Sequence, residues 1–200
     1  VTGNTMIDAL LEVTGRDLSC AWPTAGRRLV LVTAHRRENF GAPFQEICRA
    51  LRHLAERNPD VDFVYPVHPN PNVHDVARTA LAEAPNVQLC APLEYDAFVA
   101  AMKQAHFILS DSGGVQEEAP ALGKPVLVLR NETERPEAVN AGVVKLVGPN
   151  FERIVTEAQR LLDDPVAYGA MAKGVSPYCD GHAAAPTEQH PRPPLAARPV

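Results

Sequence analysis

The chain has 200 residues, enough for one domain or two small ones with a substantial core. Charged residues make up 22% of it and the formal net charge is -5, which argues against a nucleic-acid or anionic-membrane partner. Its longest apolar runs are far shorter than a bilayer span, and its N-terminal stretch lacks the pattern of a secretory signal. We therefore expect neither a transmembrane helix nor a leader.

The elements predicted along the chain alternate between apolar strands and amphipathic helices. Residues 1–27 begin without methionine and are typical of a linker that runs into a helix, so the chain is expected to be part of something longer. Apolar, β-branched runs then predict strands over 29–35, 61–68, 86–93, 106–112, 125–130 and 143–148. Helical periodicity predicts helices over 43–57, 73–84, 95–105, 114–123 and 151–162.

This alternation predicts an α/β fold, a Rossmann-like doubly wound parallel sheet formed by residues 28–175. Ligands of such sheets bind beyond the carboxyl ends of the strands, and the polar and glycine residues gather in those loops. Residues 176–200 hold six of the 19 prolines, and we expect this tail to be disordered.

Four cysteines, Cys20, Cys48, Cys90 and Cys179, lie far apart with no C-x-x-C pair. This spacing favours reduced thiols in a cytoplasmic protein over a disulfide framework or a zinc site, so we predict no metal.

The stretch SDSGGVQEE (110–118) follows an apolar strand and opens a helix. Gly113 and Gly114 would let a phosphate approach the amides of the first helical turn, and the Ser112 hydroxyl could donate to it. Glu117 or Glu118 could accept hydrogen bonds from a ribose diol. A helix start with acidic first-turn residues is stabilising by itself, so a structural role stays open.

Two more strand-end loops carry candidate ligands. TAHRREN (33–39) holds His35, two arginines and Glu38, which suit an anion site or form a solvated loop with an internal Arg–Glu pair. VHPNPN (67–72) adds His68 after the next strand, so a shared pocket is expected.

The stretch RNETERPEA (130–138) offers Arg135 as a phosphate ligand, although such charge density is also typical of a solvent-facing loop. PLEY (92–95) could present an apolar edge to a uracil ring or be an ordinary helix start. The sequence contains no G-x-x-x-x-G-K-[ST] and no G-x-G-x-x-G, which argues against a P-loop NTPase or a dinucleotide oxidoreductase.

The motifs TAHRRENFG, YPVHPNPNV, PLEY, DSGGVQEEAPALGKPVLVLRNETERPEAVNAG and SPYCDGHA closely resemble the C-terminal half of the non-hydrolysing UDP-N-acetylglucosamine 2-epimerases. The likeness covers roughly residues 1–184, and VTGNTMIDALL is similar to that family's crossover between two Rossmann-like domains. The resemblance implies one half of a GT-B-like two-domain architecture, with the active site in the cleft.

The family activity implied is the interconversion of UDP-GlcNAc and UDP-ManNAc, by elimination of UDP across C1 and C2 and its re-addition. No cofactor is implied, and the product would serve cell envelope polysaccharide biosynthesis in the cytoplasm. Family members are often homodimers. Their catalytic carboxylates belong to the N-terminal domain that this chain lacks, so the isolated chain should not epimerise.

The resemblance also assigns residues. His35 would be the catalytic-site histidine, and His35, Glu38 and His68 would match an allosteric UDP-GlcNAc site of regulated members. UDP would be bound by Ser112, Gly113, Gly114, Glu118 and Arg135. The chain departs from the family at Cys179 and in the tail that follows it. Two alternatives remain, a donor-binding domain of a GT-B glycosyltransferase and a non-catalytic UDP-sugar binding module.

Overall fold

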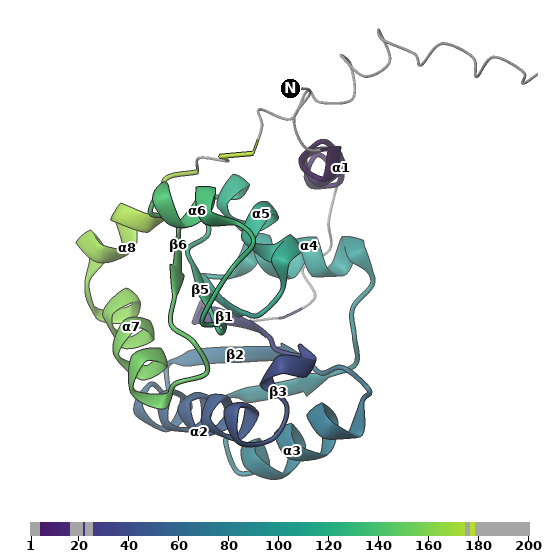
Figure 1. The fold of residues 1–200 in the computed structure, drawn as a ribbon, viewed down its shortest axis with the longest axis vertical. Helices are drawn as coiled ribbons and strands as arrows, with labels where there is room; N and C mark the ends of the chain where they lie inside the picture. Colours follow the sequence, from purple (N-terminus) through teal and green to yellow (C-terminus); the bar gives the residue numbers. More distant parts are fainter. Residues whose placement is uncertain (1–4, 17–21, 23–25, 175–176, 179–200) are drawn as a thin grey trace, which may run out of the picture.

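The computed structural model describes residues 5–16, 22, 26–174 and 177–178. They form a six-stranded sheet in the order β3-β2-β1-β4-β5-β6, and every neighbouring pair is parallel (Figure 1). The strands are β1 (Arg28–Thr33), β2 (Val61–Pro66), β3 (Val87–Cys90), β4 (Phe107–Ser110), β5 (Val126–Val128) and β6 (Val144–Leu146). All six predicted strands and the predicted Rossmann-like sheet are therefore confirmed.

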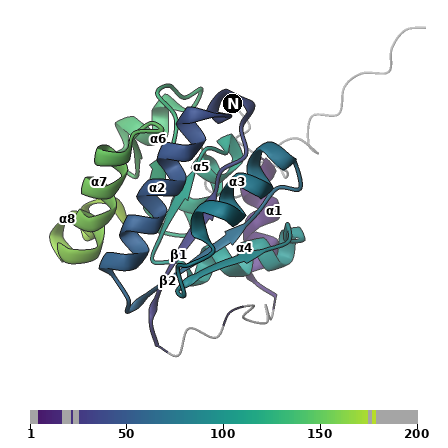
Figure 2. The ribbon, with the colours of Figure 1, turned by 90° about the horizontal axis from the view of Figure 1, so that it is seen from below.

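Helices cover both faces of the sheet (Figures 1 and 2). One face is covered by α2 (Ala42–Arg57), α3 (Pro71–Leu81) and α7 (Phe151–Asp163). The other is covered by α1 (Thr5–Thr14), α4 (Tyr95–Gln104), α5 (Gly113–Ala121) and α6 (Pro136–Asn140). A 3-10 turn, η1 (Arg37–Asn39), follows β1, and α8 (Pro165–Met171) follows α7.

Each strand contributes to two hydrophobic cores because successive side chains point to opposite faces. Val30 and Val32 of β1 pack with α2 and α7, whereas Leu29 and Leu31 pack with α1, α4 and α5. All four side chains are buried. Burial on both faces explains why the strands are continuous apolar runs.

The strand order places the site. β1 pairs with both β2 and β4. The chain runs from β1 through β2 to β3 at one edge of the sheet, then returns to the other side of β1 and runs through β4 and β5 to β6. The loops after β1 and β4 therefore diverge to opposite faces and leave a crevice at their carboxyl ends.

Two helices were not predicted, α6 and α8, which have 5 and 7 residues. Both are too short for apolar periodicity to show, but both begin with proline. In α8 the Asp164 carboxylate caps the helix by accepting hydrogen bonds from the amides of Val166 and Ala167.

Cys48 and Cys90 are free thiols, and burial raises the pKa of Cys48 to about 12. Cys20, Cys179 and nearly all of the tail predicted to be disordered lie outside the described residues. Among the helices that the structure describes, none has the length and apolar character needed to cross a bilayer.

Candidate functional site

A cavity of about 380 Å³ opens at the carboxyl ends of β1, β2 and β4. It joins three of the predicted strand-end loops to PLEY (92–95) and to α1. We call it the switch-point cavity. Its lining residues are Met6, Thr33, His35, Pro66, His68, Pro92, Leu93, Tyr95, Phe98, Ser112, Gly114, Val115 and Glu118.

The N-terminus of α5 faces this cavity. Ser112 is the N-cap, yet its side chain makes no capping hydrogen bond. A Cβ atom built on Gly114 would lie 3.6 Å from Met6 Cε and 3.9 Å from Glu118 Oε2, so it would occupy space on the cavity side. The missing side chain therefore leaves room for an anion to approach the positive end of the helix.

Glu118 lies one turn further along α5 and also lines the cavity. The residue is 4% exposed, and Oε1 of its carboxylate accepts a hydrogen bond of 2.8 Å from the Tyr95 hydroxyl. Burial raises the pKa of Glu118. The hydrogen bond from Tyr95 lowers this pKa, and the nearby Glu117 carboxylate raises it further. The carboxylate is thus a hydrogen-bond acceptor held next to the helix N-terminus.

Asp111 holds the loop after β1 in place. Its carboxylate is fully buried and Oδ2 accepts hydrogen bonds from the amides of His35 (3.0 Å) and Arg36 (2.8 Å). The same oxygen accepts from Asn39 Nδ2 at 3.0 Å, and that amide also donates to the Leu129 carbonyl. Sequence reasoning gave Asp111 no role, although an acid directly after a buried strand was a signal.

His35 and His68 come together from neighbouring strand ends, as the shared-pocket hypothesis requires. Their rings stack with centroids 5.8 Å apart and an interplanar angle of 17°. His35 Nδ1 also lies 3.8 Å from Asp111 Oδ1, and its side chain is 43% exposed. The imidazole of His35 is therefore oriented on one side and accessible on the other.

Glu38 does not pair inside its own loop, so that alternative is wrong. Its carboxylate accepts from Nε of Arg130, whose guanidinium also donates to both oxygens of Glu134 at 2.8 and 2.9 Å. The Arg130 side chain is only 8% exposed, and a buried guanidinium needs such carboxylate partners. The hydrogen bonds from Arg130 lower the pKa of Glu134 to about 2.

Arg135 is not among the residues that line the switch-point cavity. It is the N-cap of α6, and its Nε donates to Glu117, whose side chain is 6% exposed. α5 thus presents Glu118 to the cavity and Glu117 to Arg135. A role for Arg135 as a phosphate ligand stays a prediction.

Some lining residues were missed by sequence reasoning. Met6 reaches the cavity from α1, more than 100 positions before α5, and no local pattern pointed to it. Phe98 stands in the first turn of α4, three positions after Tyr95 of the PLEY stretch, and an aromatic side chain at that place was a usable signal.

The fold and the cavity together define a class, a Rossmann-like α/β domain whose switch point presents a helix N-terminus to an anion. The sequence model of the UDP-N-acetylglucosamine 2-epimerase family matches residues 1–187. The chain belongs to the UDP-N-acetylglucosamine 2-epimerase family.

Similar proteins include a probable UDP-N-acetylglucosamine 2-epimerase of Ralstonia nicotianae, 53% identical over 196 residues that cover 92% of this chain and 52% of the relative. The chain spans about half the length of the curated relatives it matches. A UDP-GlcNAc 2-epimerase structure from Neisseria meningitidis, bound to UDP-GlcNAc, is 44% identical with a TM-score of 0.89, over 94% of this chain and 54% of that one.

The glycosyltransferase SnogD of Streptomyces nogalater is 19% identical with a TM-score of 0.56, over 84% of this chain and 44% of that one. At this identity, the similarity to SnogD shows a shared fold alone. It agrees with the predicted half of a GT-B-like architecture.

Proposed function

We propose that this chain is the UDP-binding half of a UDP-N-acetylglucosamine 2-epimerase. The observation that carries the proposal is the switch-point cavity, where the N-terminus of α5 and the Glu118 carboxylate lie side by side. The 44% identical Neisseria meningitidis structure, bound to UDP-GlcNAc, supports this choice of ligand.

Each part of UDP would have a partner at the cavity, although Gly113, unlike its neighbour Gly114, is not among the lining residues. The diphosphate would lie against the amides of Gly113 and Gly114 and the Ser112 hydroxyl, where the helix dipole stabilises negative charge. The ribose hydroxyls would donate to Glu118. The uracil ring would pack on Phe98 and the apolar edge of the PLEY loop, both of which border the cavity.

In the complete protein the proposed reaction is an elimination followed by an addition. A base removes the C2 proton of the sugar, the C1–O bond breaks, and its electron pair leaves on the diphosphate of UDP. UDP then adds back to C1 while C2 receives a proton on its opposite face. The N-terminus of α5 and His35 would stabilise the charge on the departing diphosphate, and the base would belong to the preceding domain.

The remaining assignments are part of the same proposal. Stacking of His35 on His68 supports a second nucleotide-sugar site beside the first. Glu38 is paired with Arg130, so it would bind a ligand there either through its other carboxylate oxygen or after breaking that pair. The free thiols Cys48 and Cys90 support a reducing compartment, so we place the protein in the cytoplasm.

Isothermal titration with UDP tests the site. We expect Glu118→Gln and Gly114→Ala each to weaken UDP binding at least about tenfold, because the first loses a charged acceptor and the second fills the anion's approach. UMP should bind more weakly than UDP. Gly169→Ala is the matched control, since a Cβ there meets no atom within 4 Å, and its affinity should equal that of the parent chain.

A fusion tests the reaction. The N-terminal half of the Ralstonia nicotianae relative, joined to this chain, should exchange the C2 proton of UDP-GlcNAc with solvent deuterium, whereas this chain alone should not. UDP binding without exchange in a folded fusion would favour the non-catalytic binding module. Absence of UDP binding in a folded parent chain would refute the proposal.

A further inference from the structure

A second cavity, of about 500 Å³, lies between α3 and the ends of β2 and β3. We call it the α3 cavity. Its volume lies in the range of small-molecule sites. Its lining residues are Val67, Pro69, His74, Arg78, Leu89, Cys90, Ala91 and Pro92.

The α3 cavity is separate from the switch-point cavity but shares a wall with it. Along the end of β2, Pro66 and His68 line the switch-point cavity, whereas Val67 and Pro69 line the α3 cavity. Strand alternation sends successive side chains to opposite faces. The two cavities therefore lie back to back, and Pro92 borders both.

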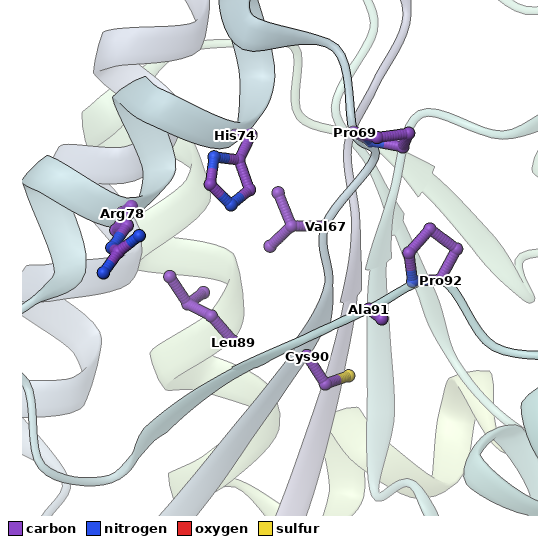
Figure 3. A pocket seen from close by; sticks show the side chains of 8 residues that line it. All are labelled: Val67, Pro69, His74, Arg78, Leu89, Cys90, Ala91 and Pro92. Atoms are coloured by element: carbon purple, nitrogen blue, oxygen red, sulfur yellow. The ribbon is translucent and has the colours of Figure 1, made fainter.

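The walls of the α3 cavity differ in chemistry (Figure 3). Val67 and Leu89 form an apolar floor, and Pro69 and Pro92 stand on the side of the strand ends. The backbone under Val67 is held by a hydrogen bond of 2.9 Å from its amide to the Cys90 carbonyl, which continues the pairing of β2 with β3 beyond the end of β2. An apolar molecule could thus be buried on a preformed surface.

The opposite wall carries one guanidinium and one imidazole. His74 and Arg78 project from α3, and their spacing of four places them one helical turn apart on the same side. None of the lining residues is acidic; the nearest acid in sequence, Asp75, is exposed, and its Oδ1 accepts a hydrogen bond of 2.9 Å from His74 Nδ1. A guanidinium beside an apolar floor suits a pair of oxygens of a carboxylate or phosphate.

We propose that the α3 cavity binds a small molecule with an apolar ring and one anionic group, the ring on Val67 and Leu89 and the anion on Arg78. The imidazole of His74 would flank the ring. This inference does not rest on the proposed function, because it uses another face of the sheet and other residues.

Phenyl phosphate is the probe, with inorganic phosphate as the anion alone and benzyl alcohol as the ring alone. In ¹H–¹⁵N correlation spectra of the 200-residue chain, phenyl phosphate should shift the amides of Val67, Arg78 and Leu89. It should bind at least about tenfold more tightly than either partial probe, because both walls are used.

Three variants decide whether the cavity is responsible. Arg78→Gln should weaken phenyl phosphate binding about tenfold while leaving UDP affinity unchanged, and Ala91→Phe should reduce binding by filling the space without a change of charge. Arg57→Gln, an exposed arginine in the last turn of α2, is the control and should bind normally.

The proposal is overturned if the shifts are confined to residues 112–118, if no shifts occur, or if Arg78→Gln binds as Arg57→Gln does. The UDP titration is independent. A chain that binds UDP but not phenyl phosphate would refute the α3 site alone, and the reverse would refute the UDP site alone.

Discussion

At the scale of single residues, the site depends on a buried carboxylate, that of Asp111, which is not among the residues that line the switch-point cavity. Asp111 collects donors from the loop after β1, namely the amides of His35 and Arg36 and the side chain of Asn39. Buried donors are costly when they lose their acceptor. The position of the candidate histidine is therefore fixed by a residue in a different loop.

We predict that Asp111→Asn destabilises the fold by about 2–3 kcal/mol, because an amide replaces one acceptor oxygen with a donor that faces other donors. Urea unfolding followed by circular dichroism measures the difference. Asp75→Asn, at an exposed position on α3, is the control and should change the free energy of unfolding by less than about 0.5 kcal/mol. Equal unfolding midpoints for both variants would contradict this account of the loop.

At the scale of elements, the starts of α3, α7 and α8 are fixed by local polar groups. Asn150 caps α7 by accepting from the Arg153 amide at 2.9 Å, and Asp164 caps α8 through two amides. Both caps satisfy amides that the helix itself leaves without partners. At α5 the side chain of the N-cap, Ser112, makes no such bond, as is also true of the N-caps of α2, α4 and α6, so the cavity rather than the missing cap supports a ligand there.

We expect Asp164→Ala to cost about 1 kcal/mol of folding free energy, the usual value for a lost helix cap. Asp164→Asn keeps an acceptor oxygen in the same place and should lose only a fraction of that. Thermal unfolding of the two variants and the parent chain makes the comparison. If Asn is as damaging as Ala, charge rather than capping stabilises α8.

At the scale of the whole molecule, one histidine joins the sheet to two helices. The His106 ring stacks on Tyr168 of α8 with centroids 4.1 Å apart and contacts the Leu161 carbonyl of α7, and its backbone amide donates to Leu29 of β1. Burial is the main reason that the pKa of His106 is lowered, and the nearby cations Arg28 and Lys124 add to it.

This lowered pKa predicts acid sensitivity. As the pH falls through 6.5, the unfolded chain protonates His106 while the folded chain does not, so the unfolded state binds more protons and the free energy of unfolding decreases. The loss ends once the pH lies below the folded pKa. His106→Gln should flatten the dependence of the unfolding free energy on pH as the pH falls below 6.5, relative to His74→Gln. An unchanged slope would show that other groups cause it.

The sequence alone determined the elements and the loops that matter. Apolar runs located all six strands, and the composition of SDSGG and of the loops around His35 and His68 identified three walls of the switch-point cavity. These features follow from neighbours along the chain, since strand and helix patterns and glycine's lack of a side chain are local properties. The resemblance of the same loops to those of the UDP-N-acetylglucosamine 2-epimerases also indicated the family to which the chain belongs.

Only the tertiary structure decided the partners. It placed β1 beside β4, brought Met6 over the N-terminus of α5, and gave Glu38 to Arg130 rather than to its own loop. It also turned Glu118 towards the cavity while its neighbour Glu117 pairs with Arg135. These contacts join residues distant in sequence. For the ion pairs, a buried charge needs an opposite charge, and only the packing of the sheet and helices determines which one lies within reach.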